Sequence, residues 1–447
     1  MFRTLLISTA FVSFLGSELI AEQVAVGPDR LRALGVAALE QGDPVTAGYA
    51  ANALIERDPT DVPALILRAE TAVTMGDFDT AYTAATSAWR NADVPVAKFA
   101  SARLAALAMA GQQRHTWAQF WLRRARQTAP DDLTRQMIAE DYEYVRRQNP
   151  LSFTLDFNAS PTDNVNNGSE KDTLTLPGLP FVFALTGDAR ALPGTEYSAG
   201  LALRYRIRET PRSVTWLEST VFGRTYTLSD DALDIKPDAK GADYAETQLS
   251  FGIGHLWSPD GGPDPWRFSA SFGRFWYAGE PWSDFRRVQV SRGVTLSDSD
   301  ALDFGLTLEH HVNAEVADSD AYGLTAEWRH RFDDVGTLTL GAGGRRVDAD
   351  GFDRAYDAVS VEASWQVSDR GPLVSYEIEQ RAFDTSFYLF DRRVDTRYTA
   401  RVEVPVPQVE LYGFRPVFNV EHSRQLSNVN RFDTETTGAG ISIRSAF

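Results

Sequence analysis

The chain has 447 residues, a formal net charge of −17 and a pI near 4.9. This length allows about two or three domains, and the acidic balance argues against nucleic-acid binding through a basic surface. The sequence has no cysteine, which excludes disulfides, thiolate metal sites, cysteine nucleophiles and a lipid-modified N-terminal cysteine.

The first residues have the pattern of an export signal peptide, which we place at residues 1–21. Arg3 supplies a positive charge, and an apolar stretch follows it as far as Leu15. Ala21 is the candidate last residue, although Leu19 is larger than the residue expected two positions before a cleavage site. The alternative is a membrane anchor, but the apolar run is short for one, and no later stretch predicts a membrane-spanning helix.

Residues 22–149 predict an all-α domain of helical repeats. A Gly-Asp step at 42–43 recurs at 76–77, a spacing of 76 − 42 = 34 residues. Small residues recur with the same spacing: Ala47 and Ala51 return as Ala81 and Ala85. Such residues allow two helices to pack closely, and a Gly-Asp step suits the turn between them.

A looser third copy has Gly111 at its turn and Trp117 and Trp121 in its second helix. The period and the small positions resemble tetratricopeptide repeats (TPR), which stack into a concave surface that binds protein segments. The aromatic positions of that family are largely missing, so a plain bundle of helical hairpins remains an alternative. The charged residues are most simply the solvated faces of these helices.

At Asn149-Pro150 the hydrophobic period changes from about 3.6 to 2, and it stays at 2 to the end of the chain. We therefore predict that residues 150–447 form an antiparallel transmembrane β-barrel of about 14 strands. The strands are expected near 151–160, 196–208, 213–227, 243–257, 265–277, 284–295, 301–312, 321–332, 335–345, 354–367, 372–382, 395–405, 410–422 and 435–447.

The competing architecture is a soluble sandwich, and three observations favour the barrel. The predicted strands run about 10–14 residues, long enough to cross a bilayer at a tilt. Their polar side carries charges in strand after strand, which a wet lumen tolerates. Long connections alternate with short ones, as in outer-membrane barrels with short periplasmic turns. An even strand number then places both ends of the barrel, and the repeat domain, in the periplasm.

The last strand ends as a barrel-assembly signal would. Phe447, Ser445, Ile443 and Ile441 fall on one side of an extended strand. We expect this strand to close the barrel against the strand that begins at Leu151 and to be recognised by the barrel-assembly machinery.

The residues offer no catalytic or metal-binding pattern, so we expect no enzyme and no cofactor. His310 and His311 are adjacent on a strand and should face opposite sides, so they could not chelate one metal. Glu377 and Glu379 share a face and could imitate a catalytic pair, but the neighbouring Arg381 favours a ladder of structural charges.

The order of a TPR-like domain and a barrel is similar to two groups of bacterial proteins: the surface lipoprotein assembly modulator (Slam) family and outer-membrane polysaccharide exporters. The start of the barrel favours the first. After an amphipathic strand, Pro161 precedes Asn164 and Asn166, and the segment resembles the family's entry motif. Residues 197–200 look like the opening of its second strand. The chain departs from the better-known members in two features. Its repeat domain is small, and Ser445 stands where barrel signals commonly have an aromatic residue.

The resemblance implies an outer-membrane translocon that moves a client lipoprotein or secreted protein from the periplasm to the surface. The repeats would engage the client or its periplasmic chaperone, and the barrel would provide the passage. Asn164 and Asn166 are the substrate-contact candidates, in a connection too long to be only a turn; a purely structural turn is the simpler reading of both. A polysaccharide exporter and a passive porin-like channel remain alternatives.

Overall fold

The computed structural model describes residues 26–176, 179–368, 371–389 and 391–445. The predicted export signal at 1–21 and the terminal Phe447 lie outside the described residues. Within the described ranges, no helix is long and apolar enough to cross a membrane. The chain divides into two compact units, one ending at Gln112 and the other beginning at Gln113.

The first unit consists of α-helices joined by short turns. The helices are α1 Pro28–Glu40, α2 Pro44–Arg57, α3 Val62–Met75, α4 Phe78–Asn91 and α5 Pro95–Gly111.

The two Gly-Asp steps each end one helix and begin the next. Gly42 and Gly76 have φ angles of +80° and +76°, a left-handed conformation that glycine adopts without steric cost. The side chains of Asp43 and Asp77 each accept a hydrogen bond of 3.1 Å from the backbone N–H three residues later. The repeated step therefore encodes a helix end followed by a helix start.

Small side chains let these helices approach closely. Ala47, Ala51, Ala81 and Ala85 are fully buried, and the first two pack against Leu67 of α3. A larger side chain at these positions would have to separate the helices. The all-α, TPR-like repeat fold predicted from the 34-residue spacing is confirmed.

Gly111 differs from its predicted place in a turn. It is the last residue of α5, and the residue with positive φ that follows is Gln113, at 60°. A Cβ atom on Gly111 would lie 2.4 Å from the ring of Phe78. Glycine is needed here for the close approach of an aromatic ring, and not for backbone conformation.

The second unit begins with two helices and continues as a sheet. The helices are α6 His115–Gln127 and α7 Asp132–Gln148. The first half of the barrel is β1 Leu151–Thr162, β4 Gly194–Thr210, β5 Ser213–Leu228, β6 Glu246–Trp257, β7 Trp266–Tyr277, β8 Glu280–Thr295 and β9 Asp300–Asn313. The second half is β10 Ser319–Phe332, β11 Gly336–Ala349, β12 Tyr356–Gln366, β13 Leu373–Phe383, β14 Val394–Pro405, β15 Phe414–Ser427 and β16 Thr434–Ser445.

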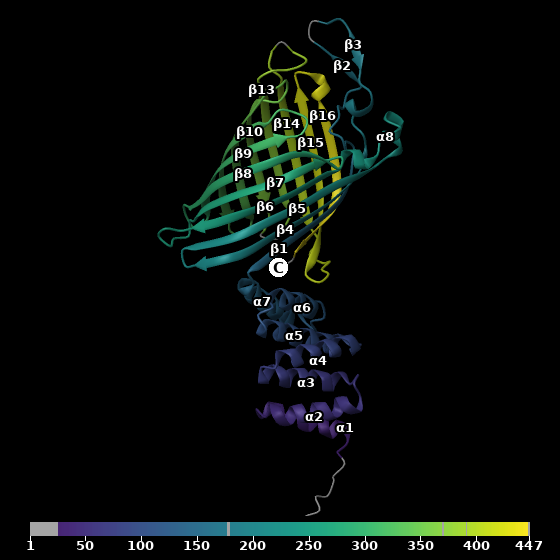
Figure 1. Cartoon of the computed structure of the whole chain (residues 1–447), viewed down its shortest axis with the longest axis vertical. Helices are drawn as coiled ribbons and strands as arrows, with labels where there is room; N and C mark the ends of the chain where they lie inside the picture. The colour runs from purple at the N-terminus through teal and green to yellow at the C-terminus, as the bar shows by residue number, and fades with distance from the viewer. Residues whose placement is uncertain (1–25, 177–178, 369–370, 390, 446–447) are drawn as a thin grey trace, which may run out of the picture. The chain divides into compact units, whose positions relative to one another are not determined.

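Fourteen strands close into one antiparallel barrel, in which each strand pairs with its neighbours in sequence and β16 pairs with β1 (Figure 1). Besides short 3-10 helices, the connections contain β2 Thr173–Thr175, β3 Val182–Ala184 and the helix α8 Asp230–Ile235. The predicted antiparallel barrel of about 14 strands is confirmed, whereas these three elements were not predicted.

The outer surface of the barrel is apolar and open to its surroundings. Leu324 in β10 is 64% exposed, although a soluble fold would bury a leucine in the middle of a strand. Other apolar side chains exposed on this surface are Phe153, Phe157, Leu217, Val221, Phe251, Ile253, Phe304, Val359, Val361, Val374, Phe418, Ile441 and Ile443. A continuous band of this kind faces lipid, as in outer-membrane barrels, and excludes the soluble sandwich.

The connections differ between the two ends of the barrel. At the end where β1 begins they are residues 211–212, 258–265, 296–299, 333–335, 367–372 and 406–413. At the opposite end they are 163–193, 229–245, 278–279, 314–318, 350–355, 384–393 and 428–433. We call these the turn end and the loop end. Outer-membrane barrels have short turns on the periplasmic side and longer loops outside.

Several strand boundaries differ from the prediction, and two of the strand starts have a clear local reason. The strand expected from 284 begins at Glu280, because Ala278 and Gly279 form a tight turn with φ angles of 52° and 83°. The strand expected from 410 begins at Phe414, because Tyr412 and Gly413 have φ angles of 50° and 73° and end the preceding turn.

We predict that Leu324→Arg destabilises the folded barrel in vesicles by about 2–4 kcal/mol, the cost of a cation near the bilayer midplane. Thr325→Arg, one residue along on the opposite face, should change stability little, because that face is polar. Urea titration followed by heat-modifiable migration measures both variants. Equal losses in the two variants would contradict the assignment of the lipid-facing side.

Candidate functional site

The inner face of the barrel is lined by charges that pair between strands, some of them neighbours and some two strands apart. Glu309 on β9 lies between two arginines: its oxygens are 2.5 Å from Arg287 Nε and 3.0 Å from Arg345 Nη2. Further inward pairs are Arg204–Glu218, Arg224–Glu246, Arg329–Asp303, Arg401–Glu421 and Arg444–Glu403. Paired charges of both signs largely neutralise one another along this part of the inner face.

The predicted charge ladder includes the pair that could have imitated a catalytic site. The Glu379 carboxylate is 2.6 Å from Arg381 Nη2 on the same strand. Glu377 lies directly opposite Glu362 on β12. Arg381 is thus paired with Glu379, while Glu377 and Glu362 face the lumen side by side.

The two adjacent histidines face opposite sides of the wall, as the strand period predicts. His310 Nδ1 is 2.8 Å from Asp320 on the outer side, whereas His311 Nδ1 is 3.2 Å from the hydroxyl of Ser283 on the inner side. In the described part of the chain, no group of histidine and acidic side chains is arranged to hold a metal ion.

Large aromatic side chains on the inner face cover glycines of the neighbouring strand. A Cβ atom on Gly254 would lie 2.2 Å from the ring of Trp216, and one on Gly273 would lie 2.7 Å from the ring of Phe285. Both aromatic side chains are buried in the wall. Pairs of this kind stabilise a strand at glycine. The signal in the sequence is a glycine on the polar side opposite an aromatic residue.

The first connection of the loop end, residues 163–193, contains the two asparagines singled out in the sequence. Figure 1 shows its strands β2 and β3 beyond the strand ends, and Asn430, just before β16, donates to the carbonyl of Thr173 at 3.0 Å. Asn164 is buried; its Nδ2 donates to the carbonyl of Gly168 at 2.9 Å, and its Oδ1 accepts from the Gly168 N–H at 2.9 Å. Its Nδ2 also lies 3.3 Å from the carbonyl of Glu435 in β16.

Asn166 organises the same connection from within. Its Nδ2 donates to the carbonyls of Asp188 and Arg190 at 3.1 and 2.8 Å, and its Oδ1 accepts from the N–H of Leu192 at 3.0 Å. The amides of Asn164 and Asn166 are therefore engaged with backbone groups of their own surroundings. Whether either also contacts a substrate stays a prediction.

A second group of contacts ties this connection to the next one. Asp188 Oδ2 lies 2.5 Å from Lys236 Nζ, and Tyr244 donates its hydroxyl proton to Asp188 at 2.5 Å. Burial and the neighbouring Asp188 raise the pKa of Tyr244 to about 12, so its hydroxyl stays protonated. Beneath them, Val165 and Leu192 belong to one buried apolar cluster.

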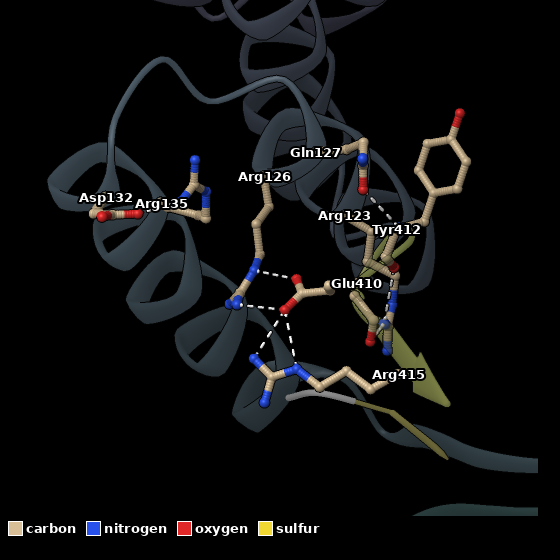
Figure 2. A network of polar contacts seen from close by, with 9 residues as sticks. Arg123, Arg126, Gln127, Asp132, Arg135, Glu410, Tyr412 and Arg415 are labelled. Atoms are coloured by element: carbon tan, nitrogen blue, oxygen red, sulfur yellow. Dashed lines mark hydrogen bonds and ion pairs between the residues drawn. The ribbon is translucent and has the colours of Figure 1, made fainter. Parts of the chain in front are cut away.

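At the turn end, α6 is bound to the connection between β14 and β15 (Figure 2). Glu410 accepts from Arg126 Nε at 2.7 Å and Nη2 at 3.0 Å, and Arg415 Nη2 lies 2.9 Å from the same carboxylate. Arg123 donates to the carbonyl of Gly413 at 3.0 Å. The Tyr412 N–H donates to the side chain of Gln127, another α6 residue, at 2.9 Å.

The Glu410 carboxylate is more acidic than an ordinary glutamate. Burial raises its pKa, but the hydrogen bonds from Arg126 and Arg415 outweigh burial, so the pKa is held below its usual value near 4.5. The contact is therefore fully formed near neutral pH. Sequence reasoning missed it, because the partners are separated by more than 280 residues.

The predicted assembly signal is described in part. Ile441 and Ile443 point outward from β16 and are exposed on the lipid-facing side. Ser445 is the last residue of β16, and its side chain and Phe447 lie outside the described residues. The pairing of β16 with β1 at Asn158 is the closure expected of this strand.

The sequence matches no protein-family model and no curated protein. Similar solved structures exist for each part of the chain. The first TPR domain of the human RPAP3 protein is 15% identical, with 27% of this chain and 94% of that one covered, at a TM-score of 0.25. An outer membrane channel from Pseudomonas putida F1 is 12% identical, with 65% of this chain and 94% of that one covered, at a TM-score of 0.35. A Pseudomonas aeruginosa FadL homologue is 12% identical, with 67% of this chain and 93% of that one covered, at a TM-score of 0.31.

We predict that Asn164→Ala lowers the stability of the loop end by about 2–4 kcal/mol, because it leaves buried backbone groups without partners. Faster protease cleavage within residues 163–193 would report this change. Thr175→Ala, an exposed position of the same connection, is the control and should leave cleavage unchanged. A variant with unchanged cleavage but impaired transport would instead favour direct substrate contact.

The contact at Glu410 should weaken at acid pH. Because the folded-state pKa is lowered, its stabilisation is present above pH 4.5 and is lost as the pH falls below that value. Spin labels at Gln136→Cys and Gln408→Cys, in a chain without other cysteines, should show a broader distance distribution once the pH falls through the lowered pKa of Glu410. The Glu410→Gln variant should show a broad distance distribution at every pH. The Asp132→Asn variant should show the same pH dependence as the parent. A parent distribution that is independent of pH would refute the assignment.

Proposed function

We propose that this protein is an outer-membrane translocon of the surface lipoprotein assembly modulator type. It would move a client lipoprotein or secreted protein from the periplasm to the cell surface through the barrel. The helical repeats would engage the client, or a periplasmic chaperone that carries it, and no catalytic step is involved.

The observation that carries the proposal is the attachment of α6 to the turn end. Arg126, Glu410 and Arg415 join the helix to the connection between β14 and β15, and α6 begins only three residues after Gln112, where the repeat unit ends. A passive channel has no need of helices bound to its turn end. A transporter that must receive its cargo on that side does, because binding there raises the local concentration of the client.

The character of the lumen is consistent with this role. Inward arginines and glutamates such as Arg287 and Glu309 neutralise one another, so a polar chain could pass without a deep electrostatic trap. We propose that movement follows binding on the periplasmic side and folding or release outside.

A polysaccharide exporter of the TPR-plus-barrel type is the second candidate for the same architecture. The short repeat region, α1 to α7, argues against it, because the repeat arrays of the exporters it resembles are far longer. The gene beside this one discriminates between the two: a small exported lipoprotein favours the first and a glycan synthase the second.

Deleting the gene should abolish surface exposure of the neighbouring lipoprotein, measured by protease shaving of intact cells. Complementation with the full chain should restore exposure. Glu410→Gln should restore it severalfold less well, whereas Asp132→Asn, which removes an exposed ion pair within α7, should restore it fully. Unchanged exposure after deletion would refute the translocon function.

A further inference from the structure

A row of outward side chains, polar on three of its four strands, crosses the lipid-facing side of β7 to β10 near the loop end. Phe272 on β7 pairs with Arg286 on β8, Arg286 with His310 on β9, and His310 with Asp320 on β10. Paired residues of an antiparallel sheet point to the same face. Phe272 is 62% exposed on the outer surface, so the whole row lies outside. We call it the Arg286 row.

The row marks the border of the apolar band. Asp320 is one residue from the loop end of β10, and His310 is three residues from the loop end of β9. Two residues farther along their strands toward the turn end, the outward side chains become apolar: Val288, Leu308 and Tyr322. A polar row above an apolar band is the depth at which lipid head groups meet acyl chains.

Among the described residues of this region, Arg286 is a cation without a side-chain partner. Arg274 is held by two hydrogen bonds to Asp284, at 2.6 and 2.8 Å, and Asp320 is held by His310 at 2.8 Å. Among the described residues, no side chain forms an ion pair or hydrogen bond with the Arg286 guanidinium, which is exposed. A cation at the edge of a hydrocarbon layer is costly unless an anion accompanies it.

An arginine on the same face of the same strand provides a comparison. Arg292 lies six residues farther toward the turn end, since 292 − 286 = 6, and its guanidinium stacks on the ring of Trp266 at 5.0 Å. That cation has a partner from the protein. Arg286 has its five N–H donors available for a ligand.

The surface around Arg286 is hollowed. A groove of about 910 Å³ runs beside it, and a second groove of about 580 Å³ adjoins the first. Both grooves are lined by Phe251, Phe272, Arg286 and His310. The larger groove continues over apolar side chains toward the turn end: Leu217, Ile253, Val288, Leu308 and Tyr322.

We propose that Arg286 and these grooves bind a phosphate-bearing lipid of the outer leaflet. The guanidinium fork of Arg286 matches a phosphate group in a bidentate manner, and the apolar groove below it accommodates acyl chains. Charge complementarity and the apolar floor together select an anionic amphiphile, because a free anion would leave the floor uncovered. The proposal depends on the position of the barrel in a membrane and is independent of the translocon function.

The test is lipid binding to the purified full-length protein in detergent, measured by native mass spectrometry. The probes are lipid A with its phosphates, the same lipid after phosphatase treatment, and inorganic phosphate. We expect phosphorylated lipid A to bind the parent, and Arg286→Gln to bind it about tenfold more weakly, as loss of a charge-assisted hydrogen-bond pair implies. The dephosphorylated lipid should bind the parent and Arg286→Gln equally.

Arg292→Gln is the matched control and should bind the phosphorylated lipid as the parent does. Heat-modifiable migration verifies that each variant is folded, and Arg286→Lys, which keeps the charge but loses the fork, should give intermediate affinity. Equal affinity of the parent and Arg286→Gln would overturn the proposal. Full competition by inorganic phosphate at millimolar concentration would also overturn it, because the site would then recognise an ion and not a lipid.

Discussion

The structure depends on closure of one sheet in a medium that offers no hydrogen bonds. Every backbone N–H and C=O in the lipid layer must be paired within the barrel, so β16 has to meet β1. In the part of the chain that the structure describes, this seam has three paired positions, Asn158, Ala159 and Thr162 on β1, whereas the other neighbouring strands have ten to sixteen. Pro161 contributes to the difference, because proline has no N–H to donate.

The connection at 163–193 reinforces the loop end of this seam. Asp163 accepts from the Thr437 N–H of β16 at 2.8 Å, and the Glu170 N–H donates to the carbonyl of Asp433 at 2.9 Å. Asn164 adds its bond to β16. Asn164, which sequence reasoning selected as a substrate contact, thus has a structural partner across the closing seam.

The sequence predicted what periodicity encodes and missed what distant residues build together. Alternation of apolar and polar residues predicted the barrel, its strand number and the face of His310, because a strand has a fixed period of two. The Gly-Asp spacing predicted the repeats, because a left-handed glycine and a capping aspartate are local requirements. Strand starts at Glu280 and Phe414 were displaced, because turn conformation depends on single backbone angles. The contact of Glu410 with Arg126 has no local signal at all.

The helices α6 and α7 reinforce the other end of the same seam. On one side, Arg206 of β4, the neighbour of β1, donates to the carbonyl of Arg147 in α7 at 2.8 Å. On the other side, Arg126 of α6 holds Glu410, in the connection before β15, the neighbour of β16. The helices thus contact β4, next to β1, and the connection that precedes β15, next to β16. Loss of the contact between Arg126 and Glu410 would therefore weaken the wall next to the seam, where the neighbouring strands have the fewest paired positions.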